Sequence, residues 1–241
     1  MTVDRWTQTV RHQLGLGRLL PLGGAGDGAW ISESAADAVL RRAAASMRDV
    51  RLGPVRIGLA DPEDSHESVV PPPPSALPPG PLRVTAEFAA TANEPLPAAG
   101  ARLRAVLMAA AEGLGLAVAE VDLRVTALID AADEGPEPLP VRPPEPAPAL
   151  SSGGTDEGRA ADVALSVPGV AHLTGTLGRP VHIEERRMEP AAALPRRHVR
   201  VELAVRADHH RALVVAREVR ARVKQALPDH PTVAVLVTTV R

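Results

Sequence analysis

Side chains that could do chemistry are few in this chain of 241 residues, and they are scattered. The chain has no cysteine, which excludes disulfides, thiolate zinc sites, iron–sulfur clusters and cysteine nucleophiles together. Its serines lie at expected helix starts, in loops or beside proline, and no G-x-S-x-G elbow is present to activate one of them. We therefore expect a protein that is not an enzyme.

The densest group of metal-ligand types is Asp208-His209-His210. Adjacent side chains in a turn between a strand and a helix point in different directions, so two neighbouring histidines chelate one ion poorly. Asp208 is better explained as the cap of the helix that follows. His172, His182 and His198 could converge in space, which the sequence leaves open. We expect neither a metal nor another cofactor.

Acidic pairs and a glycine-rich segment complete the search for a site. Glu184-Glu185 is followed by two arginines, and Asp133-Glu134 lies in a proline-rich stretch, so we expect both pairs to be solvated. Residues 23–28, GGAGDG, precede an expected helix but follow no expected strand and lack the Lys-Ser/Thr of a phosphate-binding loop. Asp27 would also repel phosphate, so we interpret this segment as a flexible connector.

A basic stripe on the last long helix is the best candidate for a binding surface. Arg217, Arg220 and Lys224 recur at i, i+3 and i+7, opposite the apolar side, and Arg200 lies upstream. Such a stripe can follow phosphates or anionic lipid, and its plain alternative is a solvated helix face. A net charge of −2 and 1% aromatic residues argue against nucleic acid. Residues 175–178 match the G-x-x-G of a KH domain, but among strands rather than between helices.

Proline divides the chain, because fifteen of its 25 prolines lie in residues 60–81 and 131–150. Proline fixes φ and has no N–H to donate, so we expect both stretches to be extended, solvated spacers. A proline-reading domain as receptor for the PPPP run is the alternative. The expected organisation is an N-terminal extension (1–29), a first unit (30–130) with a Pro-rich insertion (60–81), a linker (131–155) and a second unit (156–241).

Apolar periodicity predicts the same order, helix–strand–strand–helix–strand, in both units. The first unit has a helix within 31–47 capped by Ser32 or Ser34, strands 50–59 and 82–91, a helix 98–113 and a strand 118–129. The second has a helix 156–167, a strand near 181–183, a strand 198–206, a helix 209–227 and a strand 232–240. In strand 118–129 we expect one inward face made of Val121, Leu123, Val125, Ala127 and Ile129.

Residues 82–88, LRVTAEF, align with residues 199–205, VRVELAV, which indicates an internal repeat. We therefore predict an α+β fold of two related units, whose small sheets are covered by helices on one face. The other, polar face of each sheet should meet water or a neighbour. Units of this size are marginal alone, so we expect the two to pack together.

Six segments carry a resemblance to a known family: SVPGVAHLTG (166–175), VRVELAV (199–205), EVRARV (218–223), VAVLVTTV (233–240), GAWISESAADAVLRRAA (28–44) and LGLAVAEVDLRVTAL (114–128). In these segments the chain resembles the alkaline-shock and general-stress envelope protein family of Gram-positive bacteria. The resemblance implies a non-enzymatic cytoplasmic protein, tethered near the membrane by an integral membrane partner and linked to cell-envelope stress.

The N-terminus has no unbroken apolar stretch, so we expect no signal peptide, no membrane span and a cytoplasmic location. Trp6, Val10 and Leu14 could line a short helix that packs on its own domain or binds a membrane surface or partner. We expect an interaction or scaffold protein whose partner is an integral membrane protein or a homologous domain, with self-association open. The alternative is a nucleic-acid-binding protein that uses the basic stripe.

Overall fold

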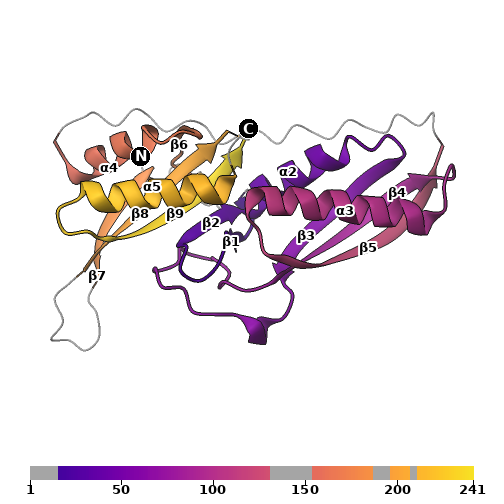
Figure 1. Cartoon of the computed structure of the whole chain (residues 1–241), viewed down its shortest axis with the longest axis horizontal. Helices are drawn as coiled ribbons and strands as arrows, with labels where there is room; N and C mark the ends of the chain where they lie inside the picture. Colours follow the sequence, from indigo (N-terminus) through magenta and orange to yellow (C-terminus); the bar gives the residue numbers. More distant parts are fainter. Residues whose placement is uncertain (1–15, 131–153, 187–195, 207–210) are drawn as a thin grey trace, which may run out of the picture.

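The computed structural model describes residues 16–130, 154–186, 196–206 and 211–241 (Figure 1). Its first half contains β1 (Leu19–Pro21), β2 (Ala29–Ser32), α2 (Glu33–Ala44), β3 (Val50–Leu59), the 3-10 turn η1 (Pro62–Asp64), β4 (Leu82–Thr91), α3 (Leu96–Leu114) and β5 (Val118–Ile129). Its second half contains α4 (Asp156–Leu165), β6 (Val170–Leu173), β7 (Val181–Arg186), β8 (Arg196–Val205), α5 (Ala212–Ala226) and β9 (Thr232–Val240). Helices pack over two mixed sheets, which confirms the α+β class.

The sheet of the first half has the order β3-β4-β5, with β3 antiparallel and β5 parallel to the middle strand β4. Strand β4 alternates as its sequence predicts, and its inward residues Leu82, Val84, Ala86 and Phe88 are all buried. Helices α2 and α3 pack on that inward face. Helix α2 begins at Ser32, whose hydroxyl accepts a hydrogen bond from the Ala35 N–H at 3.2 Å, as one of the two expected caps.

The second half repeats this arrangement around β8, which is antiparallel to β7 and parallel to β9. Helices α4 and α5 cover the face formed by Val199, Val201, Leu203 and Val205. A short additional strand, β6, pairs with the carboxyl-terminal part of β8. In Figure 1 the two halves lie along the long axis of the molecule, with α5 and α3 end to end in front of the sheets.

The N-terminal extension differs most from expectation, because it supplies two strands to the sheet of the second half. Strands β1 and β2 form an antiparallel hairpin, and β2 pairs in parallel with β9, with Ala29 opposite Val235. The expected boundary at residue 30 therefore falls inside a strand. Residues 23–28, expected as a flexible connector, form the turn of the hairpin, and the Asp27 carboxylate accepts the Gly24 N–H at 2.8 Å.

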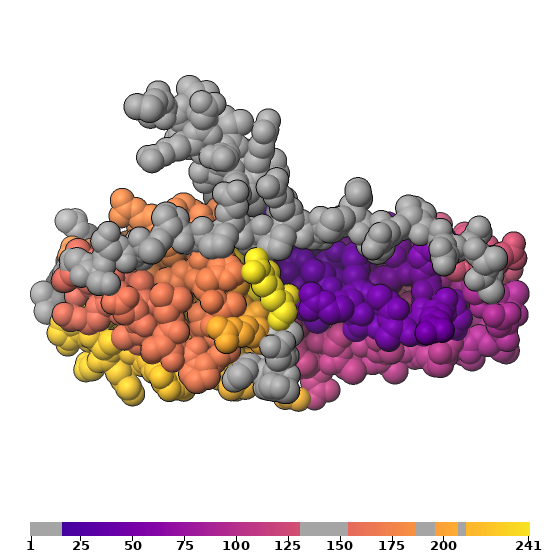
Figure 2. Space-filling view, turned by 90° about the horizontal axis from the view of Figure 1, so that it is seen from above, coloured from indigo at the N-terminus to yellow at the C-terminus, as the bar shows by residue number. Residues whose placement is uncertain are grey.

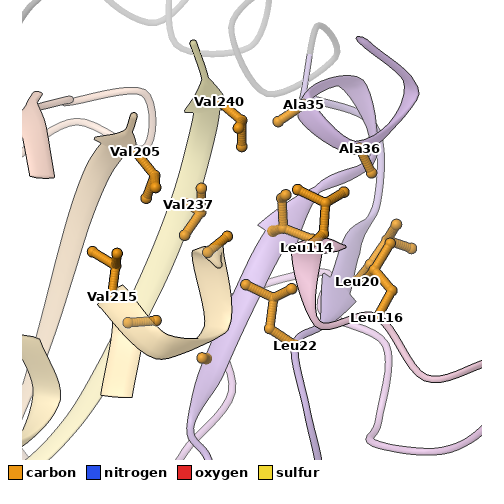
Figure 3. Packing of buried hydrophobic residues seen from close by; sticks show 14 of the residues in the cluster. Leu20, Leu22, Ala35, Ala36, Leu114, Leu116, Val205, Val215, Val237 and Val240 are labelled. Carbon is orange, nitrogen blue, oxygen red and sulfur yellow. The ribbon is translucent and has the colours of Figure 1, made fainter. Parts of the chain in front are cut away.

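The two halves share one continuous apolar core at their junction. Figure 3 shows Leu22 and Leu114 of the first half facing Val215 and Val237 of the second. In Figure 2 the C-terminal end, in yellow, lies between the orange second half and the indigo residues of the first. Gly115 has a positive φ and sits against Leu213, where a Cβ would lie only 2.4 Å from the leucine. Only glycine fits this contact between α3 and α5.

The Pro-rich insertion 60–81 is extended in large part and many of its residues are solvated, as expected, but part of it also packs on the sheet. It crosses the outer face of the six-stranded sheet, where Val70 packs with Leu19, Trp30 and Leu236 in a second apolar cluster. Its backbone is fixed as well, since the Leu77 N–H donates to the Leu19 carbonyl at 2.8 Å. Proline has no N–H, so a Pro-rich chain can cover an apolar surface without burying an unpaired donor.

Strand β5 departs from its predicted inward face. Among the five residues expected to face inward, Val121 is buried, whereas Val125 remains 39% exposed. Irregularities in the pairing with β4, between Leu82 and Arg83 and between Phe88 and Ala89, shift the alternation. As a result Leu128, not Ala127, lies opposite the inward-facing Ala90. Among the described residues β5 is also an edge strand, with a neighbouring strand, β4, on one side alone.

Candidate functional site

A buried ion pair lies on the outer face of β8. Glu202 is fully buried, and its Oε1 lies 3.4 Å from Nε of Arg200. The strand beside β8 is interrupted opposite Glu202, where the Thr174 N–H donates to the Glu202 carbonyl at 2.9 Å and the Glu202 N–H donates to Pro180 at 2.8 Å. The intervening loop returns over the sheet, and its Leu177 N–H donates to the Glu202 carboxylate at 3.0 Å.

This position has a clear electrostatic consequence. Burial raises the pKa of Glu202 to about 7, although the Leu177 N–H and Arg200 both favour the charged form. Residues 175–178, which match the G-x-x-G motif of a KH domain, belong to the loop that covers this carboxylate. The arrangement fastens a loop to a sheet. It does not present an acid to a substrate, because the carboxylate is sealed from solvent.

His198 lies on the same outer face and is also buried. Its Nδ1 is 2.8 Å from Oγ1 of Thr232, and burial lowers the pKa of His198 to about 4, so the imidazole is neutral at pH 7. His182 and Glu184 lie across from it on β7, opposite Arg200 and His198 respectively. Glu184 is half exposed beside Arg186, in agreement with a solvated carboxylate.

Metal ligands do not gather in the part of the chain that the structure describes. His172 lies on β6 opposite Ala204, away from His182, and no three carboxylate or imidazole side chains of the described residues could hold an ion together. Asp208-His209-His210 and Asp133-Glu134 lie outside the described residues, as do the linker up to residue 153 and the stripe of Trp6.

The predicted basic surface is divided by the structure. Arg217 forms a two-pronged ion pair with Asp27, with Nε 2.7 Å from Oδ1 and Nη2 2.9 Å from Oδ2. This hydrogen-bonded arginine is the main reason that the pKa of Asp27 is lowered. Arg220 donates to the Gly26 and Asp27 carbonyls of the same turn. Both guanidinium groups therefore fix the β1–β2 hairpin to α5.

The other two predicted residues lie elsewhere. Arg200 is on the outer face of β8 with 16% of its side chain exposed, paired to Glu202. Lys224 is exposed further along α5. Arg200 thus lies on the sheet face opposite to the one that α5 covers, whereas Arg217, Arg220 and Lys224 stay on one helix, with Arg217 paired to Asp27.

The outer face of the sheet β3-β4-β5 is exposed, polar and balanced in charge. Arg83 of β4 lies 2.6 Å from Glu120 and 3.6 Å from Asp122, both on β5. Glu87 of β4 lies 3.7 Å from Arg124 of β5. These pairs are solvated, so each contributes little to stability, and the face remains available to a partner.

The two edges of this sheet differ. At β3, the Arg18 guanidinium donates to the Ile57 carbonyl at 2.6 Å, the Ile57 N–H donates to the Glu33 carboxylate at 3.2 Å, and Arg41 donates to the Leu52 carbonyl at 3.4 Å. Side chains therefore occupy the backbone groups of that edge. At β5, Arg104 of α3 reaches the Val121 carbonyl at 3.1 Å, while the strand runs on for eight more residues to Ile129.

Exposed apolar side chains gather beside the β5 edge. Val125 is 39% exposed and Leu128 63% exposed. Met108, 41% exposed, lies one helical turn beyond Arg104 and therefore on the β5 side of α3. Sequence reasoning missed this surface because it treated the alternation of strand 118–129 as evidence of burial. The polar residues Glu120, Asp122 and Arg124 indicated a one-sided strand, but alternation carries no signal of which strand lies at the edge of the sheet.

Comparisons of this chain with protein-family models, curated proteins and solved structures found no match. In the described part of the chain, no helix has both the length and the apolar character required to cross a membrane.

Proposed function

We propose that this protein is a non-enzymatic interaction or scaffold protein that binds a protein partner through the β5 edge of its first half. The observation that carries this proposal is the contrast between the two edges of one sheet. Side chains of Arg18, Glu33 and Arg41 occupy the β3 edge. On the β5 edge Arg104 takes the Val121 carbonyl, and the strand beyond it is long and flanked by exposed apolar side chains. An open edge of this kind is a template for strand pairing.

The site chemistry supports the same proposal. Glu202 and His198, the described groups whose pKa values are shifted most, make structural contacts. Glu202 accepts from the Leu177 N–H of the loop above it, and His198 is hydrogen-bonded to Thr232 of β9. Arg217 and Arg220 fix a hairpin. Among the exposed apolar side chains of the described residues, Met108, Val125 and Leu128 flank the β5 edge, which suits recognition of an extended backbone.

The wider role in this proposal follows from the family resemblance of the sequence. We propose an internal duplication, supported by the shared element order of the two halves and by the alignment of β4 with β8. We also propose a cytoplasmic location, peripheral to the membrane through an integral membrane partner, and a link to cell-envelope stress.

The test is crosslinking and capture from membrane and soluble fractions with matched surface variants. The edge variant carries Val125→Lys and Leu128→Lys, and the control carries Val214→Lys, which replaces an equally exposed apolar residue on α5. We expect the edge variant to lose a crosslinked protein that the wild type and the control retain. Identical crosslinks from all three folded proteins would overturn the proposal. Thermal melts of each variant establish that loss of crosslinks is not loss of fold.

A further inference from the structure

In the second half of the chain, the strand that corresponds to β5 already has another strand paired to its edge. In the second half, β9 follows α5 and lies parallel to the middle strand β8, as β5 follows α3 and lies parallel to β4. The outer side of β9 is covered, because β2 pairs with it. The outer side of β5 has no strand beside it in the described residues. In the described residues, the sheet of the first half thus ends at β5, whereas its counterpart continues beyond β9 with β2 and β1.

The sequence of β5 is complementary to itself in one antiparallel register. When Leu123 faces its own copy, Val121 faces Val125 and Val118 faces Leu128. These five residues lie opposite β4 residues of the buried face, so all of them belong to the helix-covered side of the sheet. Apolar side chains would therefore meet apolar side chains along the whole helix-covered side.

The same register matches the charges on the outer side. Asp122 faces Arg124 of the second copy, and by symmetry Arg124 faces Asp122, while Glu120 faces Thr126. Within one chain these two charges are 62% and 79% exposed, and their own partners are 3.6 and 3.7 Å away. Shifting the register by two residues in either direction places Asp122 opposite Asp122 or Arg124 opposite Arg124, which is unfavourable.

We propose that two copies of this chain pair through antiparallel β5 strands and form one continuous sheet of six strands. This inference rests on the proposed function and names its partner as a second copy. In this register Leu123 pairs with its own copy, so a twofold axis relates the two chains and both use the same surface. The helix-covered sides of the two β5 strands then face the same way, which places both α3 helices on one face of the joined sheet. Met108, Val125 and Leu128, exposed in one chain, lie along the resulting seam.

The first test is the molar mass of the full chain in solution across a concentration series. We expect a dimer, and we expect Arg124→Glu to weaken it by about tenfold or more, because two attractive cross-strand pairs become repulsive. The control is Arg56→Glu, an exposed arginine on the opposite edge strand of the same sheet, which should leave the dimer unchanged. A wild type that stays monomeric throughout, or an unaffected Arg124→Glu dimer, would overturn the inference.

The second test determines the register by disulfide formation, since the natural chain contains no cysteine. Asp122→Cys and Arg124→Cys are made as separate proteins. Each reduced protein is exposed to an oxidant by itself, and a mixture of the two reduced proteins is exposed to the oxidant in parallel. In the proposed register only the mixture crosslinks efficiently, because the two identical cysteines of either protein alone lie beyond the reach of a disulfide. A crosslink of Asp122→Cys alone or of Arg124→Cys alone would indicate a different register and contradict the proposed one.

The outcomes separate this inference from the proposed function. A monomeric wild type whose Val125→Lys, Leu128→Lys variant still loses a crosslinked foreign protein overturns self-pairing and leaves the β5 edge as the interaction site. A dimer that neither Arg124→Glu nor the double lysine variant weakens overturns self-pairing, and it overturns the proposed function as well if the double lysine variant also keeps every crosslink of the wild type.

Discussion

The outer faces of β4 and β8 begin from similar sequences and meet opposite surroundings. Arg83 and Thr85 of β4 correspond to Arg200 and Glu202 of β8 in the aligned segments. On β4 these side chains are exposed, and Arg83 pairs in water with carboxylates of β5. On β8 they are covered, and the ion pair of Arg200 with Glu202 is removed from solvent.

The difference originates in segments that are distant in the sequence. The loop 174–180 covers Glu202, the Pro-rich insertion crosses the outer face of the neighbouring strands, and the β1–β2 hairpin extends the sheet beside β9. The first half receives no such cover in the described residues. An alternating strand therefore specifies which side faces the helices, while cover on its second side is decided by other parts of the chain.

Among the substitutions that test this difference between the two sheets, Trp30→Ala is expected to lower the unfolding free energy the most. Trp30 is buried between the six-stranded sheet and the Pro-rich insertion, so its removal leaves a cavity and should cost about 3–5 kcal/mol of unfolding free energy. Urea unfolding measures the change. Thr85→Ala on the open face is the control, with an expected change under about 0.5 kcal/mol. Equal losses in the two variants would mean that the two faces are not covered differently.

A second effect should appear in the pH dependence of stability. Since the folded pKa of Glu202 is about 7 against an ordinary value of 4.5, the folded state binds more protons than the unfolded state between these values. Stability due to this group therefore falls as pH rises from 4.5 to about 7 and is constant above that. Glu202→Gln should remove this loss, so it should be more stable than wild type at pH 8 by on the order of 3 kcal/mol and nearly equal to it at pH 4.

Urea unfolding of both proteins across that pH range is the measurement. The titration of His198 changes the free energy of unfolding in the opposite direction, since stability due to this group is lost as pH falls from 6.5 to about 4. His198 is present in both proteins, so its contribution cancels in the difference. A constant difference across the pH range would contradict a buried, raised carboxylate.

Asp27→Ala should have a smaller effect, about 1 kcal/mol, because the ion pair with Arg217 is partly solvated. The result should be loosening of the β1–β2 hairpin, measured as faster amide hydrogen exchange at Ala29 and Ile31 with β4 unchanged. The matched control is Asp122→Ala on the open sheet. Unchanged exchange in the hairpin would show that other contacts hold it to α5.

Arg83→Ala should have the smallest effect, within about 0.5 kcal/mol, because both of its carboxylate partners are solvated. The same urea measurements apply, with Arg200→Ala as the covered counterpart. This variant should cost more, on the order of 1–2 kcal/mol at pH 8, because Glu202, whose pKa is about 7, then takes up a proton instead of staying charged without its partner. An Arg83→Ala loss as large as that of Arg200→Ala would remove the distinction between the faces.

Local periodicity was sufficient for most of the fold. The bounds predicted for strands 50–59, 82–91, 118–129 and 232–240 agree with β3, β4, β5 and β9, and the helices agree within a few residues. The apolar face of β4 was also predicted correctly, because one neighbour on each side keeps its alternation regular.

The missed features all depend on long-range pairing. Residues 29–32 are too short and too uniformly apolar to reveal that they join β9, and the prolines of 60–81 indicated an extended chain without showing what it covers. The candidate residues Arg217 and Arg220 were correctly placed on one helix, yet the partner that occupies them, the turn at Asp27, is 190 residues away from Arg217. Spacing along a helix carries no information on such a partner.

The pairing of β2 with β9 has a consequence for the order of folding. Ser32 donates to the Thr238 carbonyl across 206 residues of sequence, so the β1–β2 hairpin cannot dock until β9 has been synthesised. The sheet β3-β4-β5 contains only strands from the first half and can form earlier, on the ribosome. Completion of the native structure therefore waits for the last strand, and Leu20, Leu22 and Trp30 stay without their final burial during that interval.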